Sequence, residues 1–368
     1  MAATFITRMD GEGTGPRLAV KDLIDVEGVP TTAGCKAVAV TAEPAPADAP
    51  CLAGARAAGA RIVGKVNLHE LAYGATGVNP WYGTPRNPID PGFVPGGSSS
   101  GSAVAVASGE ADVAYGSDTA GSVRIPSACC GTAGLKTTHG RISIERVWPL
   151  AQSLDTVGPM ARDMAGLVLG MQLLEPGFTV AGAPPTTVGR FLGVTADPRI
   201  DAAIDRALAG AELEVIDIDL PGWKAAFEAT MAILLAEAWV NDRHLTAERP
   251  DLVGADVSAR IGLGPGISAE ALDAARATQR AWQEELVQLF GRVEVIALPT
   301  LPSFPPEIGA DESWMVAATA AVNLGGHPAL AMPVPTADRF PASLQLVGPL
   351  QAEESLLAAG QRLEASFP

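Results

Sequence analysis

The sequence is short of charge, and positive charge is the scarcer sign. Only 18% of the 368 residues are charged, and 25 basic against 41 acidic residues leave a formal net charge of −16. A phosphate backbone would be repelled by such a surface, and no Lys/Arg cluster offsets this, so nucleic acid is excluded as a ligand. With 48% hydrophobic residues, 40 Gly and 30 Pro, the chain suits a compact, turn-rich globular protein.

Segments that would mark other classes of protein are also missing. No window approaches the roughly 20 apolar residues of a membrane helix, and residues 1–15 lack the basic and apolar regions of a secretory signal. The cysteines match no zinc spacing, so we expect buried, reduced thiols at Cys35, Cys51, Cys129 and Cys130. These absences predict a cytoplasmic protein that binds no membrane and no metal.

Short β-rich stretches alternate with Ala-rich helical ones, and the chain has no repeat or heptad pattern. Strands are predicted at residues 18–19, 61–63, 112–115, 190–194, 213–218, 293–298, 328–334 and 342–347. Helices are predicted at residues 50–58, 101–107, 163–174, 199–209, 223–244, 269–290 (starting at Ser268) and 352–365. This alternation predicts an α/β fold with a mixed sheet covered by helices, and a surface loop at residues 176–185.

Two Gly- and Ser-rich segments could carry chemistry. Residues 95–102, PGGSSSGS, could form a flexible linker or an anion-binding nest, but they lead directly into an apolar helix, which a linker has no reason to do. Residues 116–126, GSDTAGSVRIP, could form an ordinary strand-to-helix turn. They could also expose the Ser122 hydroxyl among converging backbone N–H groups, the geometry that an oxyanion requires.

A serine nucleophile needs a base to accept its proton, and histidine is a poor candidate here. None of the four histidines lies in a recognised triad motif, and His327, in GGHP, favours a structural turn. Lys21 has apolar residues on both sides, and burial there would disfavour its ammonium form and lower its pKa. The alternative is a partly buried lysine paired with Asp22.

Several segments resemble the amidase signature family, in that family's order and at about its spacing. Besides the two Gly/Ser-rich segments, they are residues 20–30 (VKDLIDVEGVP), 64–74 (GKVNLHELAYG), 83–88, 134–136, 140–141, 153–159, 298–300, 323–329 and 344–349. The resemblance implies the amidase-signature α/β fold, one large mixed β-sheet covered by helices on both faces. It also implies a single domain over residues 1–368, with a catalytic core at about 18–165, a variable middle at about 175–290 and a sheet-completing part at about 291–368.

The resemblance also implies roles for individual residues. Ser122 resembles the nucleophile, Ser98 the bridging serine after a cis peptide bond, and Lys21 the base that draws a proton from Ser122 through Ser98. The oxyanion would lie among the backbone N–H groups of Thr119, Ala120, Gly121 and Ser122. The implied substrate pocket includes Gly74, Ala75, Thr76, Trp148 and Trp314, although both tryptophans could equally be structural. Asp118 and Asp155 resemble supports of the active-site loops, Arg124 resembles a structural residue, and no metal or organic cofactor is implied.

The implied activity is hydrolysis of a carboxylic amide C–N bond of a small molecule through an acyl-enzyme. The alternatives are the ammonia-releasing A subunit of a glutamine amidotransferase, a carbamate, acylurea or ester hydrolase with the same triad, and a binding protein that has kept the fold. Lys21 lies nearer the start than the family's lysine usually does, so we expect a short, N-terminally trimmed member with a more open or differently covered substrate entrance. The short N-terminus and the poorly matching middle argue against the amidotransferase alternative. An exposed apolar face could support a homodimer.

One departure concerns the nucleophile turn itself. Many members carry Gly-Gly-Ser there, whereas this chain has Ala120-Gly121-Ser122. The methyl group of Ala120 is tolerable if this residue keeps a negative φ.

Overall fold

One mixed sheet organises the computed structural model, which describes residues 3–181 and 184–367. In the described chain the sheet has 11 strands in the order β1-β3-β2-β4-β6-β5-β10-β11-β9-β7-β8. They are β1 Phe5–Arg8, β2 Arg17–Lys21, β3 Arg61–Val66, β4 Val113–Asp118, β5 Ala133–Lys136, β6 Thr156–Ala161, β7 Thr187–Phe191, β8 Glu214–Ile218, β9 Val295–Pro299, β10 Ala329–Val334 and β11 Ala342–Val347. Strands β2 and β7 run parallel to both neighbours, and the other pairs are antiparallel.

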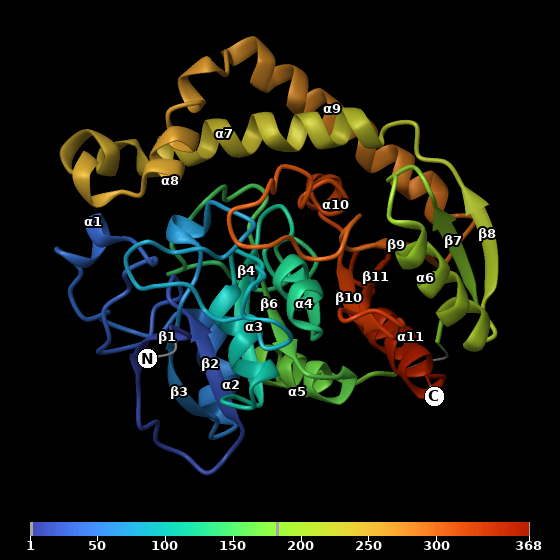
Figure 1. Cartoon of the computed structure of the whole chain (residues 1–368), viewed down its shortest axis with the longest axis horizontal. Helices are drawn as coiled ribbons and strands as arrows, with labels where there is room; N and C mark the ends of the chain where they lie inside the picture. Colours follow the sequence, from blue (N-terminus) through green and yellow to red (C-terminus); the bar gives the residue numbers. More distant parts are fainter. Residues whose placement is uncertain (1–2, 182–183, 368) are drawn as a thin grey trace.

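Helices cover both faces of this sheet (Figure 1). One layer packs in the order α2 (Ala53–Ala57), α5 (Met164–Leu174), α11 (Glu353–Ala365) and α6 (Pro198–Gly210). The other contains α3 (Ser100–Ala107), α4 (Arg124–Cys130) and α10 (Ala320–Gly325), with α7 (Trp223–Glu248) and α9 (Ala269–Phe290) packed together above α10. The short helices α1 (Lys36–Ala39) and α8 (Ala255–Ile261) and the 3-10 turns Pro50–Leu52, Glu70–Ala72, Pro250–Leu252 and Gly264–Gly266 lie in the connections.

The α/β prediction is confirmed, and the long periodic elements have the predicted bounds or nearly so. Helix α9 covers the predicted residues 269–290, and the Ser268 hydroxyl accepts the Ala271 amide as its N-cap, at 3.2 Å. Strand β7 ends at Phe191, so the prediction of residues 190–194 was placed too late. Residues 176–181 and 184–185 of the predicted loop are irregular, and residues 182–183 lie outside the described chain.

Three strands were missed because they carry no alternating pattern. Strands β1 and β5 have four residues each. Strand β6 is buried on both faces and contains Gly158 and Pro159, so it shows neither the alternation nor the β-branched run that predicts a strand.

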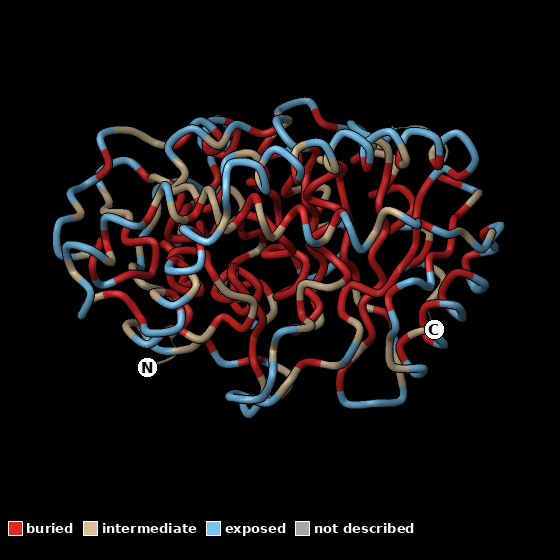
Figure 2. Tube along the Cα trace, turned by 90° about the horizontal axis from the view of Figure 1, so that it is seen from above, coloured by how far each residue is buried: buried red, intermediate tan, exposed pale blue. Residues whose placement is uncertain are grey.

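Most of the buried side chains are apolar. Figure 2 shows the buried segments gathered inside an exposed rim. The four cysteines are buried and unpaired with each other, as expected. Among the helices that the structure describes, none is both long and apolar enough to cross a bilayer.

The parallel pairing of β2 with β4 positions the candidate site. Because these strands run in the same direction, Lys21 at the end of β2 and Asp118 at the end of β4 lie at the same edge of the sheet. The start of α3 and the turn from β4 into α4 reach that edge, since the Ser99 amide donates to the Ser122 carbonyl at 3.1 Å.

Candidate active site

Lys21 lies in the interior with its ammonium group directed at two serine hydroxyls. Its Nζ donates to Ser98 Oγ at 2.6 Å and to Ser117 Oγ at 2.9 Å. Burial lowers the pKa of Lys21 to about 7, against the opposing pull of the Asp118 and Asp155 carboxylates. A neutral amine is therefore accessible near pH 7, which a lysine base requires. The alternative pairing with Asp22 is wrong, because Asp22 forms a buried ion pair with Lys65 at 2.9 Å.

Ser98 belongs to a segment that the fold encloses completely. Ser98, Ser99 and Ser100 have no exposed surface, which excludes a flexible linker. The peptide bond between Gly97 and Ser98 is cis, as the resemblance implied. The Ser98 carbonyl accepts the backbone amide of His69 at 2.9 Å.

Ser122 lies in the tight turn between β4 and α4, at the wall of a cavity. It is 9% exposed, and within the described chain its hydroxyl has no hydrogen-bond partner. The hydrogen bonds therefore connect Lys21 to Ser98 but do not continue to Ser122. Ala120 is not among the described residues with positive φ, so the condition on its methyl group is met.

The backbone amides around Ser122 differ in availability. Those of Thr119, Ala120 and Ser122 donate to no other described residue. The Gly121 amide donates to Asp118 Oδ1 at 2.9 Å, so the prediction that it would face an oxyanion is not supported. The carboxylate of Asp118 competes for the same proton.

Two buried carboxylates hold this turn in shape. Asp118 forms a buried ion pair with Arg124 at 2.8 Å, and this pair outweighs the effect of burial and holds the pKa of Asp118 well below its usual range. Asp155 accepts the Thr119 hydroxyl at 2.6 Å and the Leu150 amide at 3.0 Å, while burial raises its pKa. The supporting roles expected for Asp118 and Asp155 match these contacts.

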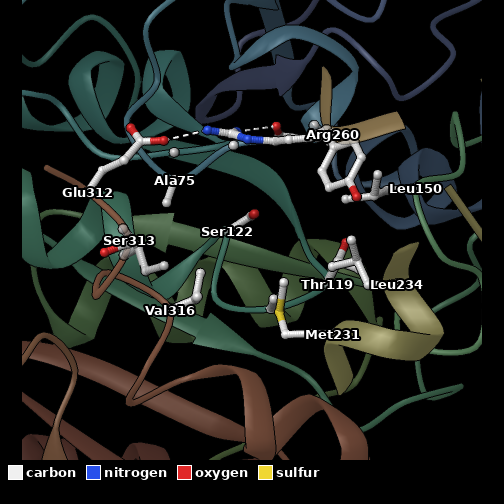
Figure 3. Close-up of a pocket in the computed structure, with 16 residues that line it drawn as sticks. Ala75, Thr119, Ser122, Leu150, Met231, Leu234, Arg260, Glu312, Ser313 and Val316 are labelled. Atoms are coloured by element: carbon white, nitrogen blue, oxygen red, sulfur yellow. Dashed lines mark hydrogen bonds and ion pairs between the residues drawn. The ribbon is translucent and has the colours of Figure 1, made fainter. Parts of the chain in front are cut away.

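The cavity beside Ser122 has a volume of about 220 Å³ and is mostly apolar (Figure 3). An ion pair between Arg260 of α8 and Glu312 lies on one side of it, and Arg260 Nη1 also donates to the Tyr73 carbonyl at 2.6 Å. The lining consists of Ala72, Tyr73, Gly74, Ala75, Gly97, Thr119, Ala120, Ser122, Ile125, Leu150, Met231, Leu234, Arg260, Glu312, Ser313 and Val316.

Only part of the predicted substrate pocket lines this cavity. Gly74 and Ala75 do. Thr76 instead bonds His69 Nδ1 at 3.3 Å. Trp148 lines a separate cavity of about 770 Å³ and donates to the buried Asp242 at 3.2 Å. Trp314 packs outside the lining and donates to the Asp311 carbonyl at 3.1 Å.

Four side chains that were not predicted line the cavity, and they come from the variable middle and from the segment that follows it. Met231 and Leu234 project from α7, Arg260 from α8, and Glu312 from the loop before α10. None of the segments that resemble the family lies between residues 160 and 297, so no motif pointed to the first three.

Comparisons with known proteins show which sequences and folds this chain resembles. The A subunit of the glutamyl-tRNA(Gln) amidotransferase of Halobacterium salinarum is 35% identical over 96% of this chain and 96% of its own. The 2-amino-5-chloromuconic acid deaminase of Comamonas testosteroni is 36% identical over 99% of this chain and 85% of its own. A crystal structure of an amidase superposes with a TM-score of 0.89 at 32% identity, covering 96% of this chain and 85% of its own. Because the Halobacterium protein is matched over nearly its whole length, shortness does not separate this chain from amidotransferase subunits.

The sequence profile of the Amidase family matches residues 14–176 and 186–357, on both sides of the irregular segment after α5. The matched residues include Lys21 at the end of β2, Ser98 just before α3 and Ser122 in the turn between β4 and α4. The chain belongs to the amidase signature family.

Proposed function

We propose that this protein hydrolyses an amide C–N bond through an acyl-enzyme formed on Ser122. The contact of Lys21 with Ser98 supports this most directly, because it joins a buried amine of lowered pKa to a serine hydroxyl. The next residue, Ser99, donates its amide to the carbonyl of Ser122, which lies at the cavity wall. Neutral Lys21 accepts the proton of Ser98 while Ser98 takes that of Ser122, and Ser122 Oγ attacks the carbonyl carbon. This step needs a hydrogen bond between Ser98 and Ser122 that forms with bound substrate.

The developing oxyanion would accept hydrogen bonds from the backbone amides of Thr119, Ala120 and Ser122, which donate to no other acceptor in the described chain. As the C–N bond breaks, the protonated Lys21 returns its proton through Ser98 to the leaving nitrogen, which departs as ammonia or an amine. Water then attacks the acyl-enzyme, passes a proton along the same path and releases the carboxylic acid.

The cavity favours a small substrate with an apolar acyl group. A volume of about 220 Å³ is below the roughly 300–1,000 Å³ of pockets that hold drug-sized ligands, so it suits a smaller substrate. Its lining includes the aliphatic side chains of Ile125, Leu150 and Leu234. Carbamates, acylureas and esters of similar size would present the same carbonyl to Ser122, so they belong in the substrate panel.

A second candidate is the A subunit of a glutamine amidotransferase, which would pass ammonia to a partner. The similarity to the Halobacterium salinarum protein over 96% of both chains favours it. The two functions differ in what activates the chain. A free-standing amidase turns over alone, whereas an amidotransferase component would release ammonia from glutamine efficiently only with its partners present.

The test is release of ammonia or amine by the purified chain from aliphatic, aromatic, carbamate and glutamine-type substrates. Ser122→Ala and Lys21→Ala should each lower kcat/KM by about 10³-fold or more. The exposed Ser143 and Lys36 supply the matched controls Ser143→Ala and Lys36→Ala, which should keep wild-type turnover. Turnover that survives in Ser122→Ala would refute the proposed nucleophile, and turnover of glutamine only in the presence of partner subunits would favour the second candidate.

A further inference from the structure

His69 is a buried histidine to which the proposed reaction gives no part. It is 2% exposed, and both ring nitrogens have partners. Nε2 lies 3.1 Å from Asp256 Oδ2 and Nδ1 lies 3.3 Å from Thr76 Oγ1. A neutral ring satisfies both contacts, with Nε2–H donating to Asp256 and Nδ1 accepting from the Thr76 hydroxyl.

The ring also packs directly on a residue of the cavity wall. A Cβ added to Gly74 would lie 2.2 Å from His69 Cε1 and Nε2, so the absence of a side chain at Gly74 makes room for the imidazole. On its other side the Gly74 carbonyl approaches Gly97, where an added Cβ would lie 2.8 Å from that oxygen. The imidazole thus supports the wall that runs from Gly74 to the peptide bond before Ser98.

The contact with Asp256 is one of three that join α8 to residues 69–76, and we call these three contacts the α8 clamp. At the start of the helix, Glu70 Oε2 accepts the Gly254 amide at 2.8 Å and His69 binds Asp256. At its end, Arg260 donates to the Tyr73 carbonyl at 2.6 Å. The hydrogen bond from His69 also lowers the pKa of Asp256 to about 2.

The α8 clamp lies between the cavity and the proton relay. Arg260, Tyr73 and Gly74 line the cavity. The backbone amide of His69 donates to the Ser98 carbonyl at 2.9 Å. His69 therefore contacts Ser98 through its backbone and α8 through its side chain. This one residue connects the helix that carries Arg260 to the residue that contacts Lys21.

We propose that the His69 side chain is a specificity-determining positioning residue, which fixes α8 and the wall at residues 74–76 at a set distance from Ser122. This role rests on the proposed function of Ser122. Removing the His69 side chain should let α8 and residues 74–76 move, while the backbone contact of His69 to Ser98 persists. Substrate binding and acyl-group selectivity should therefore change more than the rate of the chemical step.

The experiment compares substitutions that keep one ring contact at a time. In His69→Gln the side-chain amide can reach the place of Nε2 and donate to Asp256, whereas in His69→Asn it can reach only the place of Nδ1. His69→Ala and His69→Asn should raise KM by about tenfold, the low end of the loss expected for a hydrogen bond to a charged group, because the Asp256 side chain is 49% exposed. The value of kcat should stay within about threefold. They should also shift the kcat/KM ratio between a small and a bulky acyl amide, and His69→Gln should restore both quantities.

Hydrogen exchange tests the α8 clamp independently of turnover. In His69→Ala the amides of α8 and of residues 72–76 should exchange faster, while those of α3 keep their protection. His244→Ala, which removes an exposed histidine, is the control and should match wild type in kinetics and exchange. Unchanged exchange in α8 overturns the proposal, as does a His69→Gln variant that is no better than His69→Asn. If wild type and Ser122→Ala are equally inactive on every amide, the proposed function fails, and exchange alone then decides whether the α8 clamp exists.

Discussion

Replacing Asp118 by Asn should destabilise the fold strongly while changing almost no volume. Asp118 has no exposed surface and accepts hydrogen bonds from the Gly121 and Val123 amides, from the Arg124 guanidinium and from Asn323. An asparagine keeps one acceptor oxygen but turns an NH₂ group toward donors. It also leaves the fully buried Arg124 without its carboxylate at 2.8 Å.

The magnitude follows from the cost of an unpaired buried charge. Removing one partner of a buried ion pair costs about 3–5 kcal/mol. At about 2.1 cal/mol/K per residue, the unfolding entropy of a chain of 368 residues is about 0.8 kcal/mol/K. The melting temperature should therefore fall by about 4–6 °C. Because the Arg124 pair holds the pKa of Asp118 below its usual range, this difference should be constant above about pH 5 and shrink as the pH falls through that lowered pKa.

Thermal unfolding followed by circular dichroism at pH 7 measures this difference. The control is Asp205→Asn, which removes the charge of a carboxylate that is 59% exposed and pairs with Arg190 at 2.9 Å. Asp201 still neutralises that arginine in the control. It should cost less than about 1 kcal/mol, or about 1 °C. A drop of under about 1.5 °C in Asp118→Asn would refute the reasoning, since it would mean that the buried guanidinium finds other compensation.

Three further predictions concern the site. Below pH 7, the kcat/KM of the wild type should rise about tenfold per pH unit, and it should level off above pH 7. The reason is that burial lowers the pKa of Lys21 to about 7 and only its neutral form is a base. Equal values at pH 6 and pH 8 would contradict this role. Gly121→Ala should abolish activity, because the φ of Gly121 is +129° and the new Cβ would lie 2.3 Å from Thr319 Oγ1. The control Gly28→Ala should keep its activity in the same assay, since Gly28, with φ +76°, has no atom within 4 Å of an added Cβ. Trp148→Phe should leave KM within about twofold, since this indole lies outside the cavity; a tenfold rise would place it at the substrate.

Much of the fold could be predicted because its signals are local. The cap at Ser268 and the apolar period of residues 269–290 define α9 without reference to any other segment. Strands β5 and β6 could not be predicted in this way. Their residues are extended because neighbouring strands distant in sequence pair with them, as β5 does with β10.

In the candidate site, too, the residues in sequence motifs could be predicted, whereas the contacts between distant residues could not. The order and spacing of the motifs determined the family and pointed to Lys21, Ser98 and Ser122 by resemblance. Sequence could not show that Asp118 takes the Gly121 amide, or that Asp22 pairs with Lys65. A hydrogen bond depends on the distance and angle between donor and acceptor, and these are defined only in the folded chain.

By itself, then, the sequence determined the elements with strong local patterns, the family and the chemistry open to its serines and lysine. Only the tertiary structure decided which side chains share the cavity with Ser122, since Arg260 lies 138 positions further along the chain and Trp148, much nearer in sequence, points into another cavity. It also decided the pKa of Lys21, because that value depends on how completely distant segments remove the amine from water.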